Sequence, residues 1–324
     1  MDKVALIFTG GTIAMKVSSK LQGAVPSVTP DEMVSAIAEY TPYENLVPFE
    51  FSKLPSPLIT PEKMFELKQN VDRFLADDAF AGVVIVHGTD TLEETAFYLD
   101  VVTQSEKPIV LTGSMKNASE LGYDGLTNLV SSIKVVLEPA SRGKGVLVVM
   151  NYAINTAWEV TKTHTLNLDT FQSVEFGPLG IIDDDDVIYV RHLIERKPLN
   201  LTNGYMDGVH LVKVYAGMPP TVIDALVQSD AKGLVIEALG RGNVPAPLMD
   251  SIRQAREHGV EVVIVSRCLG GRVLDTYGYI GGGKDLVRAG CILGGSLSGQ
   301  KARLLLMVAL ENGLTHDQIK ALFA

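Results

Sequence analysis

The stretch His87-Gly88-Thr89-Asp90-Thr91-Leu92-Glu93-Glu94-Thr95-Ala96 places a hydroxyl and a carboxylate side by side where a buried strand is expected to give way to a helix. The preceding run, Gly82-Val83-Val84-Ile85-Val86, is apolar and β-branched, as in a strand covered on both faces of a parallel sheet. Apolar residues then recur at helical spacing, and Thr91 with Glu94 fits a capping box. Thr89 and Asp90 are therefore expected at the carboxyl edge of a sheet, where ligands bind in open α/β folds.

Two further strand-to-loop corners share this pattern. Residues 4–8 lead into Thr9-Gly10-Gly11-Thr12, and residues 109–111 lead into Thr112-Gly113-Ser114-Met115. Glycines at such corners permit unusual backbone angles and let a ligand approach the main chain. Any one of these loops alone is more simply explained as a turn. Three together favour a shared pocket.

Through about residue 190, expected strands alternate with expected helices, which is typical of a mostly parallel sheet flanked by helices. The strands are expected at 4–8, 46–51, 82–87, 108–112 and 145–150, and the helices at 31–40, 61–76, 91–103 and 124–137. A chain of 324 residues is long for a single core. A second domain is therefore expected after this one.

Residues 191–208 lose the alternation and gain charge, so we expect a linker there between an N-terminal domain at 1–190 and a C-terminal domain at 209–324. The second domain repeats the pattern on a smaller scale, with strands expected at 209–215, 233–238 and 261–266 and helices near 219–228, 246–258, 303–310 and 316–323. The predicted fold class is α/β: a larger N-terminal, mostly parallel sheet flanked by helices and a smaller C-terminal parallel-sheet domain.

Composition narrows the possible partners. A net charge of −10 without a basic stripe argues against a nucleic acid or an anionic membrane. The two cysteines form neither a disulfide framework nor a metal-binding spacing, which suits a reducing compartment. No pattern typical of an export signal precedes the first expected strand, and no apolar run approaches the ~20 residues that span a bilayer. We therefore expect a cytoplasmic protein that does not reside in a membrane.

Three other patterns are set aside. The segment 278–284 has the spacing of a phosphate-binding loop, but Asp285 stands where a magnesium-binding Ser or Thr is required, so a glycine-rich loop is expected. The acidic run 183–186 lacks the alternating ligands of a calcium loop and suits a solvated turn. The histidines are scattered and no G-x-S-x-G elbow occurs, which disfavours a Ser-His-Asp hydrolase.

With histidine and cysteine set aside, a nucleophile would have to be a threonine or serine activated by a lysine held neutral. Burial disfavours the charged form of a lysine and so favours its action as a base. Lys162 lies among threonines in residues 159–165, without an acid immediately beside it. Taken alone, this lysine is more simply an exposed surface side chain.

Three motifs together resemble those of the bacterial-type L-asparaginase family: Thr9-Gly10-Gly11-Thr12-Ile13-Ala14, the stretch 87–96, and Val160-Thr161-Lys162-Thr163. The resemblance covers nearly the whole chain. It also includes the order of the motifs and the segments 113–115, 145–151, 176–180 and 300–303.

The resemblance implies hydrolysis of the side-chain amide of L-asparagine to L-aspartate and ammonia through an acyl-enzyme ester, with no metal and no organic cofactor. It implies Thr12 as the primary nucleophile. Thr89, Asp90 and Lys162 match the second cluster, in which Lys162 acts as a base through Thr89 and Asp90 also pairs with the substrate ammonium. Ser56 matches the position that receives the substrate carboxylate together with backbone amides. These groups suit a small zwitterion.

The resemblance also implies a homotetramer of two intimate dimers, in which Asn243 reaches the pocket of a neighbouring subunit. Backbone N–H groups near Thr89 and Ser114 are candidates for stabilising the oxyanion.

Three departures from the family pattern stand out. No tyrosine occurs between Thr12 and Glu39, where many relatives carry one on a lid; here the lid reads Gly23-Ala24-Val25-Pro26. Pro57 replaces the glutamine that follows the Ser56 position in well-studied relatives. The acid that relatives contribute from a neighbouring subunit is not evident in residues 275–280.

Alternatives within the same resemblance are a glutaminase-asparaginase of broader specificity and the family's amidotransferase subunit for tRNA-linked amidation. The latter normally carries an additional N-terminal domain. A catalytically idle protein that binds an amino acid is the alternative from another class. Retention of two threonine hydroxyls and a lysine argues against it, because simple binding requires only the acid and the hydrogen-bond donors.

Overall fold

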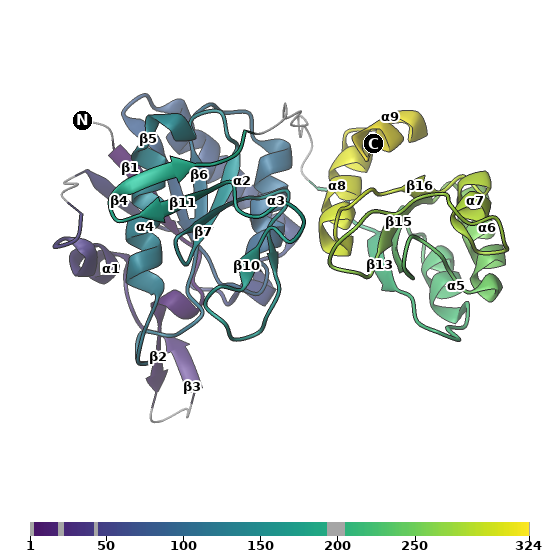
Figure 1. Ribbon diagram of the computed structural model, residues 1–324, viewed down its shortest axis with the longest axis horizontal. Helices are drawn as coiled ribbons and strands as arrows, with labels where there is room; N and C mark the ends of the chain where they lie inside the picture. Colours follow the sequence, from purple (N-terminus) through teal and green to yellow (C-terminus); the bar gives the residue numbers. More distant parts are fainter. Residues whose placement is uncertain (1–2, 19–22, 42–44, 193–204, 324) are drawn as a thin grey trace. The chain divides into compact units, whose positions relative to one another are not determined.

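The computed structural model describes residues 3–18, 23–41, 45–192 and 205–323, and the chain divides into two compact units, residues 1–198 and 199–324 (Figure 1). Each unit has its own parallel sheet and its own hydrophobic core. The linker expected at 191–208 falls mostly on residues 193–204, which lie outside the described residues.

Unit 1 is built on an eight-stranded sheet. Its strands are β1 (Lys3–Phe8), β4 (Leu46–Glu50), β5 (Phe80–Val86), β6 (Ile109–Thr112), β7 (Val146–Met150), β8 (Ala153–Thr156), β11 (Gly180–Asp183) and β12 (Asp186–Tyr189). They follow the order β12-β11-β8-β7-β6-β5-β1-β4, parallel from β4 to β7 and antiparallel from β7 to β12. The mostly parallel sheet predicted from the sequence is confirmed. The carboxyl ends of β1, β5 and β6 lie side by side in it.

Helices cover both faces of this sheet. They are α1 (Pro30–Ile37), α2 (Pro61–Ala76), α3 (Leu92–Val102) and α4 (Gly125–Leu137). Helices α1 and α4 contact each other and share a core with Leu6 and Val84. Helices α2 and α3 contact each other and pack on β5 and β7, respectively. Because successive strand side chains point to opposite faces, a strand as apolar as 80–86 requires both covers.

Local sequence signals fix where two of these helices begin. Thr29 and Glu32 form a capping box at α1, and the Thr60 hydroxyl accepts a hydrogen bond from Lys63 N at α2. Each of these helices then starts with a proline, which suits the first turn.

The capping box predicted for Thr91 and Glu94 is wrong. Thr91 does precede α3, but its side chain makes no capping hydrogen bond. Its hydroxyl instead donates to the carbonyl oxygen of Ser56 at 2.7 Å. The Thr91 hydroxyl thus bonds a residue distant in sequence rather than capping the helix as the local pattern predicted.

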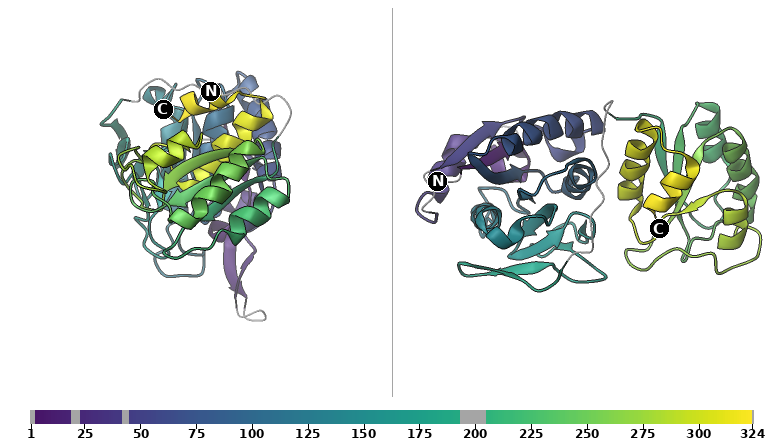
Figure 2. Two further views of the ribbon diagram at one scale, coloured as in Figure 1. Left: turned by 90° about the vertical axis from the view of Figure 1, so that its right-hand side faces the viewer. Right: turned by 90° about the horizontal axis from the view of Figure 1, so that it is seen from above.

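Shorter elements complete unit 1. They are the 3₁₀ turns η1 (Thr12–Ala14), η2 (Ser56–Leu58) and η3 (Pro139–Ser141) and the antiparallel pairs β2 (Met15–Ser18) with β3 (Gly23–Pro26) and β9 (Thr161–Lys162) with β10 (Phe171–Gln172). The β2–β3 hairpin, which contains the lid segment 23–26, projects from the body of the unit in Figure 1 and in the left view of Figure 2. The acidic run 183–186 forms the exposed turn between β11 and β12, as predicted.

Unit 2 has a four-stranded parallel sheet in the order β13 (Val209–Lys213), β14 (Gly233–Ala238), β15 (Glu261–Ser266) and β16 (Ile292–Leu293). Its helices are α5 (Thr221–Gln228), η4 (Ala246–Leu248), α6 (Met249–Glu257), α7 (Gly283–Arg288), α8 (Gly299–Glu311) and α9 (His316–Leu322). Figure 2 shows α8 and α9 on one face of this sheet and the other helices on the opposite face. The smaller parallel sheet is confirmed, whereas α7 and β16 were not predicted.

No helix among the described residues combines the length and the apolar character needed to cross a bilayer.

Candidate functional site

The loop that follows β5 brings a lysine, a threonine and an aspartate together. Lys162 Nζ, on β9, donates to Thr89 Oγ1 at 2.9 Å and to Asp90 Oδ1 at 2.8 Å. Thr89 is buried, and the Lys162 side chain is 15% exposed, whereas that of Asp90 is 65% exposed. The expectation of an exposed surface lysine is therefore wrong for Lys162. The resulting cluster joins a shielded base to a hydroxyl and leaves its carboxylate open to solvent.

Ser56 fixes this loop through two hydrogen bonds. Its Oγ accepts a hydrogen bond from Asp90 N at 3.2 Å, and its carbonyl oxygen accepts one from the Thr91 hydroxyl at 2.7 Å. Ser56 is 3% exposed and opens η2, in which Pro57 is the second residue. Proline presets the backbone angle of such a turn. Pro57 thus lacks the side-chain donor expected there but helps to fix Ser56.

Thr12 reaches the same region through a contact between two glycine backbones. A Cβ added to Gly11 would lie 2.4 Å from Gly88 Cα, and Gly11 has φ +90°, so neither space nor conformation admits a side chain. The residues that follow these glycines are Thr12, in η1, and Thr89. Close packing of the two loops therefore brings the first and second motifs side by side.

The third corner, which carries Ser114, packs against the second through Gly113. A Cβ on Gly113 would lie 2.5 Å from the carbonyl oxygen of His87 and 3.3 Å from Thr89 Cγ2. Ser114 is buried, and its hydroxyl donates to the carbonyl oxygen of Lys116. The Asp124 carboxylate accepts hydrogen bonds from Met115 N and Lys116 N, each at 3.0 Å. Hydrogen bonds among its own residues therefore fix the conformation of this loop. The three corners that the sequence singled out do meet at one place in unit 1.

His87, the first residue of the loop after β5, is buried and hydrogen-bonded at both ring nitrogens. Its ring is fully buried, with Nδ1 2.7 Å from the carbonyl oxygen of Gly88 and Nε2 3.0 Å from the Thr95 hydroxyl. A carbonyl oxygen only accepts, so Nδ1 carries the proton and Nε2 accepts from Thr95. Burial lowers the pKa of His87 to about 4 despite the hydrogen bond to Gly88, which acts in the opposite direction. The imidazole is neutral at pH 7 and serves to orient the loop.

Asn243 lies in unit 2, after β14. Its Oδ1 is buried without a hydrogen-bond partner among the described residues, and its backbone forms a bridge with Leu239. Gly242 before it has φ +103°. A buried carbonyl oxygen without a partner is costly, so this amide is a candidate for accepting a hydrogen bond from another molecule.

Neither a metal site nor a phosphate loop emerges from the described residues. No group of three or more histidine, cysteine or acidic side chains there is arranged to hold a metal ion. The glycine-rich segment 278–284 leads into the short helix α7, and the Asp285 carboxylate accepts from Gly281 N at 3.0 Å. That carboxylate takes up a backbone N–H of the loop and would repel a phosphate.

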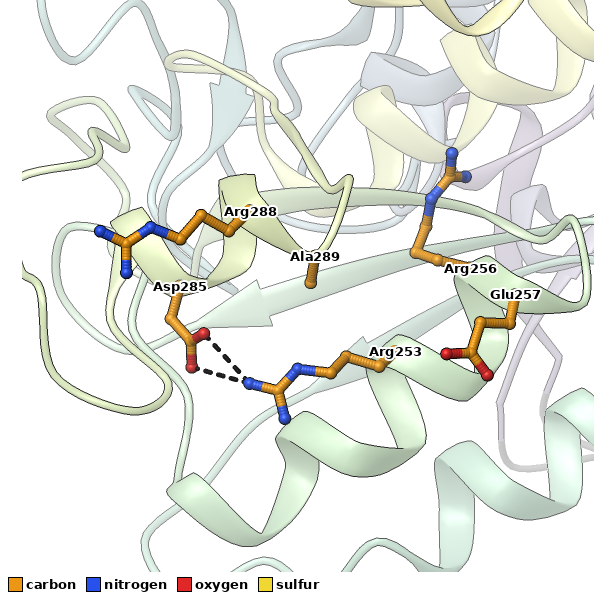
Figure 3. A pocket seen from close by; sticks show the side chains of 6 residues that line it. All are labelled: Arg253, Arg256, Glu257, Asp285, Arg288 and Ala289. Carbon is orange, nitrogen blue, oxygen red and sulfur yellow. Dashed lines mark hydrogen bonds and ion pairs between the residues drawn. The ribbon is translucent and has the colours of Figure 1, made fainter.

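A surface cleft of about 380 Å³ lies beside this segment in unit 2, lined by Arg253, Arg256, Glu257, Asp285, Arg288 and Ala289. Figure 3 shows Arg253 directed at Asp285, whereas Arg256 and Arg288 point away from the centre. Arg253 donates to Asp285 at 3.0 Å and to Asp250 at 3.0 Å, and Arg256 pairs with Glu261 at 2.7 Å. These charges are satisfied by the protein itself.

Comparison with known proteins identifies the family. The family model "Asparaginase, N-terminal" matches residues 3–195, and "Glutaminase/Asparaginase C-terminal domain" matches residues 208–323. The chain belongs to the asparaginase family. An L-asparaginase of Bacillus licheniformis is 38% identical over 96% of each chain. The crystal structure of a probable cytoplasmic L-asparaginase from Campylobacter jejuni superposes with a TM-score of 0.91 at 29% identity, covering 100% of this chain and 99% of that one.

The asparaginase family is one of amidohydrolases, so the enzyme class predicted from the motifs is confirmed. Its relatives also include a glutaminase-asparaginase of Pseudomonas aeruginosa, 30% identical over 100% of this chain and 90% of that protein. Both domains of the chain therefore match throughout their length.

Sequence reasoning missed one contact near the Thr12 turn of this asparaginase-family site. The Tyr123 hydroxyl donates to the carbonyl oxygen of Ile13 at 2.7 Å, across 110 positions of sequence. No local pattern reveals such a contact, because Tyr123 lies in a loop whose polar neighbours signal only a turn.

Proposed function

We propose that the protein hydrolyses the side-chain amide of L-asparagine to L-aspartate and ammonia through an acyl ester on Thr12. The observation that carries this proposal is the position of Lys162 Nζ, within hydrogen-bond distance of both Thr89 Oγ1 and Asp90 Oδ1. A lysine shielded from solvent and bonded to a hydroxyl can accept a proton through it, which is the task of a general base.

The substrate is proposed to bind by its charged ends. Asp90, whose carboxylate is exposed, receives the ammonium group. Ser56 Oγ accepts a hydrogen bond from Asp90 N, so the hydroxyl hydrogen of Ser56 is available to the substrate carboxylate. The ammonium group and Lys162 would then be like charges beside one carboxylate. The substrate ammonium group would compete with Lys162 for this carboxylate.

The proposed reaction has two halves. Thr12 Oγ attacks the amide carbon and loses its proton, the carbon–nitrogen bond breaks, and the nitrogen leaves as ammonia after taking up a proton. Water then attacks the ester and its proton passes through Thr89 towards Lys162. That proton returns to Thr12 Oγ as the carbon–oxygen bond to Thr12 breaks, which releases aspartate and restores the hydroxyl. Backbone N–H groups near Thr89 and Ser114 would stabilise the oxyanion in both halves. None of these steps requires a metal or a cofactor.

Assembly and location form part of the same proposal. A homotetramer of intimate dimers would bring Asn243 of one subunit to the pocket of its neighbour, where the buried Oδ1 could accept a hydrogen bond. A cytoplasmic location is proposed from the name of the Campylobacter jejuni protein.

A second candidate is a glutaminase-asparaginase of broader specificity, favoured by the relatives of that name that match the chain over its full length. The two candidates share the site and differ in how well they accept a side chain longer by one methylene. Such a difference is worth roughly 1–3 kcal/mol in a binding pocket.

The deciding experiment measures ammonia release from L-asparagine, L-glutamine and D-asparagine by the purified protein, at low and high substrate concentrations. We expect selective release from L-asparagine and none from a Thr12→Ala variant that still binds it. Comparable release from L-glutamine would establish the broader enzyme. A folded, tetrameric protein that releases no ammonia would refute the hydrolase and favour an amino-acid-binding protein.

A further inference from the structure

We propose that Tyr123 is a positioning residue for the Thr12 turn, joining it to the loop that carries Ser114. The inference rests on the proposed function of Thr12 and addresses how this turn is held in a chain without a tyrosine on its lid. The clamp loop is defined here as residues 113–124, between β6 and α4.

The clamp loop contacts the turn at two successive points. The Tyr123 hydroxyl donates to the carbonyl oxygen of Ile13 at 2.7 Å, and Ala118 N donates to that of Met15 at 3.0 Å. These two carbonyl groups flank the end of η1, whose first residue is Thr12. The orientation of the threonine backbone is therefore set by the clamp loop as well as by the contact between Gly11 and Gly88.

The clamp loop is itself rigidly held. The Asp124 carboxylate, next to Tyr123, bonds Met115 N and Lys116 N, and Asn128 Nδ2 donates to Asp124 Oδ2 and to the carbonyl oxygen of Gly113, each at 3.0 Å. The same few residues thus fix both ends of the loop. A displacement of the Ser114 end would be transmitted to the Thr12 turn through Tyr123.

The Tyr123 ring packs against Gly125. A Cβ on Gly125 would lie 2.2 Å from Tyr123 Oη and 2.4 Å from Cζ, so the ring lies flat against a position that only glycine leaves open. Burial, followed by the charge of Asp124, raises the pKa of Tyr123. The hydroxyl therefore remains a donor to Ile13 throughout the working pH range and does not exchange protons with the substrate.

The test compares Tyr123→Phe with Tyr189→Phe. Tyr189 is a matched control, because it is also a partly buried tyrosine of unit 1 with a raised pKa, about 12, and its hydroxyl lies 2.6 Å from Ser141 Oγ. We expect kcat for ammonia release to fall roughly tenfold in Tyr123→Phe, since small misplacements of reacting groups cost up to about 10²-fold. KM and the shape of the pH profile should remain those of the wild type. Tyr189→Phe should keep kcat within about twofold.

A second readout needs no substrate. Hydrogen exchange at the Met15 amide, which donates to the carbonyl oxygen of Thr12, should accelerate in Tyr123→Phe and not in Tyr189→Phe. Gly125→Ala, which displaces the ring, should reproduce both effects. Unchanged kcat and unchanged exchange in Tyr123→Phe, or equal losses in Tyr189→Phe, would overturn the proposal. A wild-type protein that releases no ammonia would count against the proposed function alone, and exchange would still decide the role of Tyr123.

Discussion

Each unit contains a loop with glycine that leads into a helix, and in each an acid in or just after the loop pairs with a basic residue distant in sequence. In unit 1 the loop 87–91 pairs Asp90 with Lys162 at 2.8 Å, and in unit 2 the loop 278–282 leads into α7, whose Asp285 pairs with Arg253 at 3.0 Å. The second loop has the spacing of a phosphate site, although Asp285 in its sequence already argues against one. The geometry supports a ligand only at the first.

The difference lies in what remains available after folding. The Asp90 side chain is 65% exposed and its basic partner also touches a hydroxyl, whereas the Asp285 side chain is 17% exposed and is bonded by Gly281 N and Arg253. A polar cluster that satisfies itself is structural. One that leaves a carboxylate open beside a shielded base can act on a ligand.

The largest effect should come from removing Lys162, the basic partner of Asp90 in the first loop. We expect Lys162→Met to lower turnover by about 10²–10⁴-fold, because general acid–base assistance is typically worth that much, with the fold retained. Thr89→Val should fall in the same range, since it removes the hydroxyl through which the lysine acts. Steady-state ammonia release and circular dichroism are the measurements.

Arg253→Met is the matched control, since it removes the basic partner of Asp285. We expect it to leave turnover unchanged and to lower stability by less than about 1 kcal/mol, as is usual for a pair that is 42% exposed on one side. Near-native turnover in Lys162→Met would remove the lysine from the mechanism. A comparable loss in Arg253→Met would erase the distinction between the loops.

A smaller effect is expected from the glycines of the two loops. A Cβ on Gly88 would lie 2.9 Å from Ser56 Oγ and 3.2 Å from Gly11 Cα, whereas one on Gly278 would meet nothing within 4 Å. Gly88→Ala should therefore lower the free energy of unfolding by about 1–3 kcal/mol, the usual cost of overpacking, and should also lower turnover. Gly278→Ala should be neutral or slightly stabilising. Urea denaturation of both variants measures this, and equal costs would contradict the close packing inferred for Gly11 and Gly88.

The sequence predicted the longer parallel strands and the three corners because the signals for both are local. Residues 82–86 are apolar without interruption, and each corner joins such a run to glycine and a hydroxyl. The antiparallel strands β8, β11 and β12 have four residues each and give no comparable signal. The partner of the Thr91 hydroxyl, 35 positions away, and that of Tyr123, 110 positions away, depend on tertiary packing. Local spacing misassigned the first of these and missed the second.

The candidate site shows the same division. Thr89 and Asp90 were singled out by their place after a buried strand. The threonine-rich surroundings of Lys162 make it a candidate base, but its own pattern favours a surface residue, and the family resemblance is what assigns it a place in the second cluster. Its position on the two-residue strand β9 explains why, since so short an element has no periodicity to read.

The smallest effect separates the loops by the pH at which each weakens the fold. The folded pKa of His87, about 4, lies below its ordinary value of 6.5. The stability contributed by the neutral ring is thus present above pH 6.5 and is lost as the pH falls towards 4. At pH 5.5 this loss should be about 1–2 kcal/mol. Asp285, whose pKa is lowered chiefly by the hydrogen bond from Gly281, loses its contribution only below about pH 4. Urea denaturation from pH 7.5 to 5 should therefore show a slope that His87→Gln removes and that Asp285→Asn does not alter. A slope that survives in His87→Gln would place the titrating group elsewhere.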